Sequence, residues 1–309
     1  MDTTEIPKRF ARTMIELHGA AGQAWLDELP IMIAEYERRW VIQVEPPFAN
    51  LSYNYVAPAV RADGSQVIIK LGMPHPELSS EIAALRFYGG NGSARLLEAD
   101  PERGALLIER LLPGGMLLDL IDDDEATRIA AQVMRALWRP APLAPEDAVF
   151  PTTSRWAAGL QRLRAAYDGG TGPLPADIVE RAEALFVELL ASSGAPLLLH
   201  GDLHHQNILS AERALWLAID PKGLIGEAEY EVGSWMRNPL PRLLELPDVT
   251  ATLARRFDIL AETLGFDRQR MSAWSYAQAV LSAWWTIEDH GHGWEPTIAL
   301  AERLAPLLK

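Results

Sequence analysis

Three residues between positions 202 and 220 have the types and the spacing of a site for phosphate and metal chemistry. Asp202 and Asn207 lie in a polar loop that follows an apolar run, and Asp220 comes directly after a second apolar run. Short apolar runs on both sides of a loop predict two β-strands, whose ends bring the side chains of the loop close together. Because carboxylate and amide oxygens are the ligands that Mg²⁺ prefers, the pattern predicts a point at which a divalent cation and phosphate oxygens meet.

The order of these residues matches the catalytic loop of protein kinases. In that loop a histidine precedes an aspartate that accepts the proton of the substrate hydroxyl, and an asparagine five residues after the aspartate holds Mg²⁺ together with a later aspartate. Here His200 precedes Asp202, and Asn207 and Asp220 follow. We therefore expect Asp202 to orient and deprotonate an acceptor hydroxyl. Asn207 and Asp220 are expected to hold Mg²⁺ against the phosphates of ATP.

Two segments resemble the aminoglycoside phosphotransferase superfamily, and within it the streptomycin 6-phosphotransferase and hydroxyurea phosphotransferase branch: HGDLHHQNIL and WLAIDPKGLIGEAEYEVGSWMRNP. The resemblance covers about residues 50–240. It implies transfer of the ATP γ-phosphate to a hydroxyl of an aminoglycoside, with streptomycin expected, and antibiotic resistance as the consequence. Gly201 replaces the arginine that in many protein kinases meets a phosphorylated activation segment, so such control is not expected. The likeness of the second segment is carried by Asp220, Pro221, Gly223, Gly226 and Glu227.

A lysine and a glutamate in the N-terminal third have the order of the nucleotide-binding pair of kinases. Lys70 closes an apolar run, and Glu81 lies in a segment that Pro76 opens and that predicts a helix. In kinases a lysine on the third strand pairs with the α and β phosphates and with a glutamate of the next helix. We therefore expect an ion pair between Lys70 and Glu81, with Glu77, one helical turn earlier, as the alternative partner.

The remaining nucleotide contacts are expected from two backbone segments. The chain has no GxGxxG motif, and residues 50–53 take the place of a glycine-rich loop, in which backbone N–H groups and the Ser52 hydroxyl would cradle phosphate. The resemblance implies that adenine lies in the crease between two lobes. Its backbone partners there would be the carbonyl of Glu109 and the N–H of Leu111.

These segments predict an α+β, protein-kinase-like bilobal fold. The first lobe, residues 1–109, would hold an antiparallel sheet and an N-terminal helical segment at residues 7–38. A Pro-Gly-Gly break predicts a hinge at residues 110–115, and residues 116–309 form a mainly helical lobe with the catalytic loop and the acceptor site. Helical patterns in that lobe span residues 116–122, 124–138, 154–167, 176–193, 227–236, 248–265, 268–289 and 296–308.

The acceptor side of the site is expected in the helical segments after Asp220. Trp284 and Trp285 are interpreted as packing residues, because aromatic side chains are so often buried. The candidate acceptor contacts are Glu227, Glu231, Trp235 and Asp289.

Composition describes an ordinary globular chain and limits the partners. The chain has no cysteine, which excludes disulfides, thiolate zinc sites and cysteine nucleophiles. Its formal net charge of −14 argues against binding a nucleic-acid backbone and suits a cationic small molecule, although the acidic residues are spread along the whole chain. We expect no membrane span and no secretory signal, and therefore a cytoplasmic protein. No obligate protein partner is indicated.

Three alternatives stay open from the sequence. The acceptor could be hydroxyurea or another small alcohol, sugar or amine metabolite. The chain could be a nucleotide-binding module without catalysis. It could also be a metal-dependent hydrolase that binds zinc through His200, His204 and His205, although the helical HExxH pattern is missing.

Overall fold

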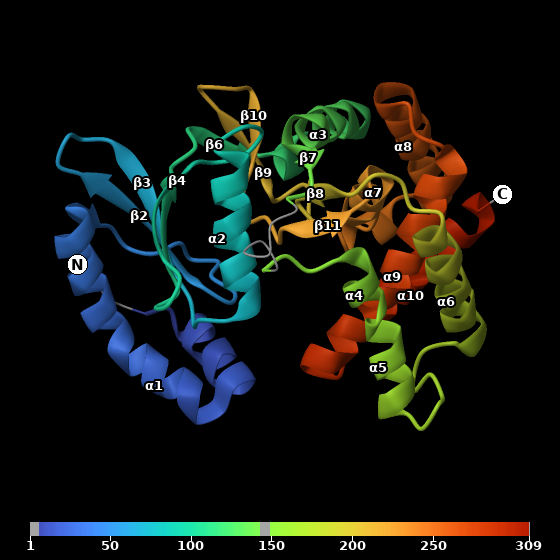
Figure 1. Ribbon diagram of the computed structural model, residues 1–309, viewed down its shortest axis with the longest axis horizontal. Helices are drawn as coiled ribbons and strands as arrows, with labels where there is room; N and C mark the ends of the chain where they lie inside the picture. Colours follow the sequence, from blue (N-terminus) through green and yellow to red (C-terminus); the bar gives the residue numbers. More distant parts are fainter. Residues whose placement is uncertain (1–5, 143–148, 309) are drawn as a thin grey trace. The chain divides into compact units, whose positions relative to one another are not determined.

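The computed structural model describes residues 6–142 and 149–308 (Figure 1). The chain forms two compact units, Met1–Gly114 and Gly115–Lys309. An antiparallel sheet dominates the first unit and helices dominate the second, so the α+β class expected from the sequence is confirmed. The hinge at residues 110–115 stays a prediction.

The first unit is built on a five-stranded antiparallel sheet in the order β1-β2-β3-β5-β4. The Asp-Gly turn between β2 and β3 has the expected hairpin geometry. Gly64 has a φ of 83°, and the Asp63 carboxylate accepts a hydrogen bond from the Ser65 N–H at 2.9 Å. The strands are β1 (Ile42–Val44), β2 (Tyr55–Arg61), β3 (Gln66–Leu71), β4 (Leu96–Asp100) and β5 (Ala105–Glu109).

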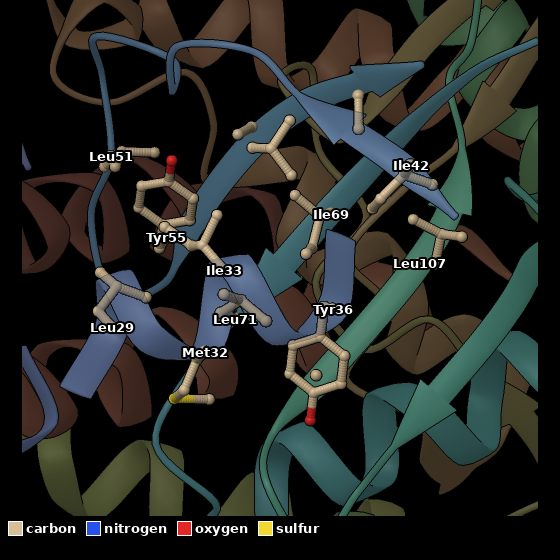
Figure 2. Packing of buried hydrophobic residues seen from close by; sticks show 14 of the residues in the cluster. Leu29, Met32, Ile33, Tyr36, Ile42, Leu51, Tyr55, Ile69, Leu71 and Leu107 are labelled. Atoms are coloured by element: carbon tan, nitrogen blue, oxygen red, sulfur yellow. The ribbon is translucent and has the colours of Figure 1, made fainter. Parts of the chain in front are cut away.

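Two helices cover opposite faces of this sheet, α1 (Lys8–Trp40) and α2 (Pro76–Tyr88) (Figure 1). Alternate residues of a strand point to opposite faces. On β3, Ile69 and Leu71 therefore pack with α1, whereas Ile68 packs with α2. Figure 2 shows the larger of the two clusters, in which side chains of α1 meet those of the strands. The same alternation places Lys70 on the α2 face of β3.

Local sequence explains the ends and the bend of these helices. α1 covers the expected segment 7–38 except Pro7, which is its N-cap, and it is kinked at Gly19, whose φ of 56° and ψ of −132° are not helical. Pro76 begins α2, where a missing N–H costs nothing. Gly89, at a φ of 56°, ends it in the left-handed conformation that glycine adopts without strain.

Helices and two three-stranded sheets form the second unit. Its long helix α9 packs against α6, α7 and α10. Among the described residues, no helix combines the length and apolar character that crossing a membrane requires. The helices are α3 (Asp123–Leu137), α4 (Thr153–Ala157), α5 (Gly159–Ala166), α6 (Ala176–Ala191), α7 (Ala228–Met236), α8 (Val249–Leu264), α9 (Arg268–His290) and α10 (Glu295–Leu304).

The two small sheets have the orders β10-β9-β6 and β11-β8-β7. They frame the polar loop that the sequence singled out, because β8 ends just before it and β9 begins just after it. Their strands are β6 (Pro113–Met116), β7 (Arg139–Pro140), β8 (Leu197–Leu199), β9 (Ile208–Ala211), β10 (Trp216–Ala218) and β11 (Leu224–Gly226).

Two helices expected from the sequence differ in the structure. The segment expected at 116–122 holds only a 3₁₀ turn at Leu117–Asp119, because Asp122 is extended and caps α3 by accepting the N–H groups of Asp124 and Glu125. The segment expected at 154–167 is split at Ala158 into α4 and α5.

Candidate active site

The β9–β10 hairpin brings Asn207 and Asp220 to the same end of one ladder. The two strands pair antiparallel, with Ala218 opposite Ile208. One step beyond, the Ile219 N–H donates to the Asn207 carbonyl at 2.9 Å. Asn207 and Asp220 therefore flank the last rung of the hairpin, although 12 residues of chain separate them in the sequence.

His200 connects the loop to the end of this hairpin, and both nitrogens of its ring and its backbone carbonyl make hydrogen bonds. Its Nε2 lies 2.7 Å from the Ile219 carbonyl, and its Nδ1 accepts the Asp202 N–H at 3.2 Å. The Lys222 N–H donates to the His200 carbonyl at 2.7 Å. These contacts require a neutral ring with the proton on Nε2. Burial lowers the pKa of His200 to about 4, which agrees with that form.

Asn207 joins the hairpin to Asp202, the residue that the sequence predicts to be catalytic. Its Nδ2 donates to the backbone carbonyl of Asp202 at 3.0 Å. An amide that uses its nitrogen in this way has its oxygen, Oδ1, left as the atom for a cation. Asp202, Asn207 and Asp220 are all partly exposed, so the end of the hairpin is accessible to a ligand.

Asp220 adopts a backbone conformation that is uncommon for a residue with a side chain. Its φ is 58°, in the left-handed region that aspartate and asparagine tolerate better than most residues. This conformation turns the chain out of β10 and lets Lys222 return to the His200 carbonyl. The aspartate is thus placed by the backbone of a turn.

A guanidinium and an imidazole lie beside the Asp202 carboxylate, whose side chain is 30% exposed. Nη2 of Arg237 lies 3.5 Å from Oδ1, and Nε2 of His204 lies 3.7 Å from Oδ2. Burial by itself raises the pKa of this carboxyl, but His204, Arg237 and Lys222 outweigh burial and lower it. Asp202 is therefore ionised at neutral pH and can accept a hydrogen bond from a hydroxyl.

Glu231, on α7, holds the backbone of the same loop by hydrogen bonds. Its side chain lies in the first turn of α7 and is buried, with 1% of the residue exposed. Its two carboxylate oxygens accept the N–H groups of His200 at 2.7 Å and of Gly201 at 2.9 Å. Burial raises the pKa of Glu231 to about 7. The sequence placed Glu231 among the acceptor contacts, and the structure places both its oxygens on the loop.

The other three acceptor candidates have different environments. Glu227 is 4% exposed and accepts hydrogen bonds from Arg270 at 2.7 and 2.8 Å and from the N–H of Gly194 at 2.8 Å. Trp235 is fully buried, and its ring stacks on that of His205 at 3.7 Å. Asp289 is exposed near the end of α9. Of the four candidates, only Asp289 is open to solvent.

The ion pair expected in the first unit is present. Nζ of Lys70 lies 2.7 and 2.8 Å from the two carboxylate oxygens of Glu81, and both residues are buried. The pair forms because alternation on β3 points Lys70 toward α2, where Glu81 lies one turn beyond Glu77. Its contact with a nucleotide stays a prediction.

The remaining candidates of the first unit are Ser52, Glu109 and Leu111. Ser52 is exposed in the irregular segment between β1 and β2. Glu109 is the last residue of β5, and its side chain accepts the N–H of Arg95 at 3.0 Å. Leu111, two residues later, is buried. Their contacts with phosphate and adenine stay predictions.

Sequence reasoning missed Arg237 and the positioning role of Glu231. A glutamate inside the apolar run of α7 was a usable signal, because a buried carboxylate needs partners. Arg237 gave no such signal. Arg237 follows the last residue of α7. Its guanidinium donates to the Ser234 hydroxyl of α7 at 3.2 Å and to the Gln278 side-chain oxygen of α9 at 3.1 Å, and these contacts hold it beside Asp202.

An antiparallel sheet with a buried Lys–Glu pair, followed by a helical unit with this loop, defines a kinase of the protein-kinase-like class. Solved structures agree with the fold. A thermostable mutant of an aminoglycoside phosphotransferase, solved with ADP and hygromycin B, superimposes with a TM-score of 0.62 at 11% identity, covering 89% of this chain and 97% of that one. The expected protein-kinase-like fold is thereby confirmed.

Sequence comparisons identify the family. The family model for aminoglycoside/hydroxyurea antibiotic resistance kinases matches residues 39–290. Streptomycin 6-kinase of Streptomyces glaucescens is 33% identical over 302 residues, which cover 97% of each chain. Hydroxyurea phosphotransferase of Kitasatospora aureofaciens is 36% identical over 296 residues, covering 92% of this chain and 81% of that one. The chain belongs to the aminoglycoside/hydroxyurea antibiotic resistance kinase family.

Proposed function

We propose that this kinase transfers the γ-phosphate of ATP to a hydroxyl of streptomycin, in the manner of a 6-kinase, and thereby confers resistance. The match to streptomycin 6-kinase over 97% of both chains supports the acceptor, and the ADP in the related aminoglycoside phosphotransferase supports the nucleotide. Hydroxyurea is the second candidate acceptor, because the hydroxyurea phosphotransferase has the higher identity, 36%, over a smaller share of its own length.

One observation carries the chemistry of this proposal. The last rung of the β9–β10 hairpin places Asn207 beside Asp220, and the Asn207 amide holds the backbone of Asp202 at 3.0 Å. Phosphoryl transfer asks a protein mainly to position its reactants and to stabilise charge. A shared backbone scaffold for the three side chains supplies that positioning.

Asp202 would accept the hydrogen bond of the acceptor hydroxyl and align its oxygen with the γ-phosphorus. Its lowered pKa makes it a weak base. This suits a loose transition state, in which the hydroxyl loses its proton late and alignment counts for more than proton removal. Asp202 then takes the proton as the new phosphate ester forms.

Asn207 and Asp220 have the donor chemistry for Mg²⁺. One amide oxygen and one carboxylate are hard ligands, and Mg²⁺ in kinases takes few protein ligands and completes its shell with water and phosphate oxygens. Across residues 6–142 and 149–308, no group of three or more His, Cys, Asp or Glu is arranged to hold a metal. When bound, Mg²⁺ would neutralise charge on the phosphates.

The histidines of the loop do not converge as a zinc site requires. His200 contacts the Ile219 carbonyl, His204 lies beside Asp202, and His205 is buried against Trp235. This arrangement disfavours the zinc hydrolase alternative on the geometry of its donors.

In the first unit, Lys70 would bind the α and β phosphates of ATP, with Glu81 fixing its ammonium group. A lysine in this role acts as a point charge and needs a partner to hold it in place. Ser52 would contact phosphate, and the Glu109 carbonyl and Leu111 N–H would contact adenine.

An acceptor panel tests the proposal. The enzyme is incubated with ATP, Mg²⁺ and each of streptomycin, hydroxyurea, hygromycin B and choline, and ADP release is measured against Asp202→Asn as the inactive control. We expect streptomycin-dependent ADP release that Asp202→Asn lowers by about 10²- to 10⁴-fold. Mass spectrometry and NMR of the product identify the modified hydroxyl. ADP release with hydroxyurea alone would shift the assignment to the second candidate. If none of the acceptors stimulates ADP release, the proposed function is contradicted.

A further inference from the structure

An indole ring lies against the backbone directly beside the catalytic aspartate. Gly201 precedes Asp202 and has a φ of 83°, and a Cβ atom built on it would lie 3.2 Å from Cη2 of Trp156 on α4. The Cβ atoms of Leu224 and Lys222 would lie at 3.1 and 3.2 Å, so Trp156 forms one side of a tight space around position 201. Gly201 is required here both by its conformation and by this contact.

A second indole completes an aromatic corner with Trp156. The ring of Trp285, on α9, meets that of Trp156 edge to face, with centroids 5.2 Å apart and an angle of 83° between the planes. Gly159 lets α9 approach, since a Cβ there would lie 3.3 Å from Nε1 of Trp285. Both rings are partly exposed, whereas the neighbouring Trp284 is 4% exposed. The sequence interpretation of Trp284 as a packing residue is confirmed, and Trp285 is only partly buried.

The same face of α9 continues with acidic residues. Glu288 and Asp289 follow Trp285 by three and four positions, the spacing of neighbours on one helix face. Arg162 binds Glu288 with two hydrogen bonds, of 2.7 and 2.8 Å. Glu288 is thus held in place by Arg162 on the face that follows the indoles.

The geometry points to Trp156 and Trp285 as an acceptor subsite that binds a planar cationic group, such as a guanidinium, beside Asp202. This inference rests on the proposed function and names the contacts that its acceptor would make. An indole face attracts cations more strongly than any other aromatic side chain does, and guanidinium groups stack on it. Streptomycin carries two guanidinium groups, whereas hydroxyurea is small and uncharged, so the subsite favours the former.

A buried tyrosine packs beneath the indole of Trp156. Tyr230 on α7 packs against Trp156 at 6.3 Å between ring centroids, and it is 1% exposed. α7 also carries Glu231, which holds the loop at His200 and Gly201. The subsite and the catalytic loop are therefore supported by the same helix, and a group bound to the subsite lies beside Asp202.

Calorimetric titration with streptomycin tests the subsite without depending on turnover. Trp156→Leu and Trp285→Leu should each raise the dissociation constant about tenfold, and Trp156→Phe and Trp285→Phe should raise it less, because a phenyl face attracts cations more weakly. The control is Trp40→Leu, which removes a partly exposed indole that stacks on Tyr36 in the first unit. The dissociation constant of Trp40→Leu for streptomycin should stay within twofold of the wild-type value. Thermal melting of every variant identifies a loss of folding, and the phenylalanine variants keep the test valid if a leucine variant fails to fold.

The outcomes separate this inference from the proposed function. Dissociation constants within twofold of wild type in both folded indole variants overturn the subsite, whatever the enzyme does with ATP. The subsite is also overturned if the wild-type enzyme does not bind streptomycin. Binding that depends on both indoles but yields no ADP release supports the subsite and contradicts the proposed kinase activity. ADP release that is insensitive to both indoles supports the activity and overturns the subsite.

Discussion

The two units hold their polar groups in different ways. In the first unit, Lys70 and Glu81 hold each other, side chain to side chain, across a strand and a helix. In the second unit, the loop from His200 to Asn207 is held mainly through its backbone, by Glu231 from α7 and by the hairpin end at Ile219. The first arrangement includes a direct pair of opposite charges, and the second is built from several hydrogen bonds to the backbone.

This difference predicts different responses to substitution. Removing one member of a buried ion pair leaves the other charge unpaired, which damages the fold as much as the site. Removing one support of a backbone network shifts the position of the loop while the rest of the network remains. Substitutions in the first unit should therefore change stability and activity together, whereas those in the second should separate them.

The largest expected effect on activity is that of Asp220→Asn. The substitution keeps the shape of the side chain and its tolerance of the left-handed backbone, and it removes the charge that would hold the metal. We expect turnover to fall by at least about 10³-fold, no less than in Asp202→Asn, because positioning of the phosphate is lost.

A matched control exists for the backbone of Asp220. Asp168 also has a positive φ, of 51°, in the turn after α5. Asp168→Asn should leave ADP release unchanged, and both variants should melt within a few degrees of wild type. Turnover of Asp220→Asn within tenfold of wild type would remove Asp220 from the site.

The next effect is that of Lys70→Met, which tests the ion pair. We expect turnover to fall about 10²-fold and the free energy of unfolding to fall by about 3–5 kcal/mol, because the buried Glu81 carboxylate loses the ammonium group of Lys70. The double variant Lys70→Met/Glu81→Leu should recover most of the stability and none of the activity. Urea unfolding and ADP release measure the two quantities. Recovered activity in the double variant would show that the pair is purely structural.

Glu231→Gln should have a smaller effect on turnover, about tenfold, because the amide keeps one acceptor for the two N–H groups of the loop and loses the other. Glu229→Gln, in the same turn of α7, is the control. Unchanged turnover in Glu231→Gln would show that the loop does not depend on this carboxylate.

Glu231 also predicts a pH dependence of stability. Because its pKa is raised from 4.5 to about 7, the folded state keeps a proton that the unfolded state loses between these values. Its contribution to stability is therefore present below pH 4.5 and is lost as the pH rises to about 7. The free energy of unfolding of wild type, relative to Glu231→Gln, should fall across this range by up to about 3 kcal/mol. A difference that is constant from pH 4.5 to 7 would contradict the buried protonated form.

The smallest expected effect is that of Arg237→Gln. At 3.5 Å from Asp202 the guanidinium contributes through its charge more than through a strong hydrogen bond. We expect turnover to fall about threefold. Since Arg237 lowers the Asp202 pKa, its removal should move the acidic limb of the kcat/KM profile to higher pH. Arg237→Lys, which keeps the charge, should leave that limb close to its wild-type position.

Much of the candidate site could be predicted because its residues are close in the sequence. Asp202, Asn207 and Asp220 lie within one loop and one hairpin, so strand pairing alone brings them together. Lys70 and Glu81 lie on consecutive elements, and alternation on β3 decides on which face the lysine lies. Glu227 and Trp235 were assigned to the acceptor for their place in the motif, but both are buried, which no local pattern could reveal.

The sequence by itself therefore determined the order of the candidate site residues and the class of fold, and it predicted the Lys70–Glu81 pair with Glu77 as the alternative, because hairpins, strand alternation and helix capping act over short stretches of chain. Only the tertiary structure decided which carboxylate holds the loop at His200 and Gly201, that Arg237 stands beside Asp202, and that Trp156, next to Gly201, meets Trp285. These contacts join segments that are far apart in the sequence, α7 to the loop at residues 200–202 and α4 to α9. Their partners are chosen by packing of whole helices, a property that no single segment contains.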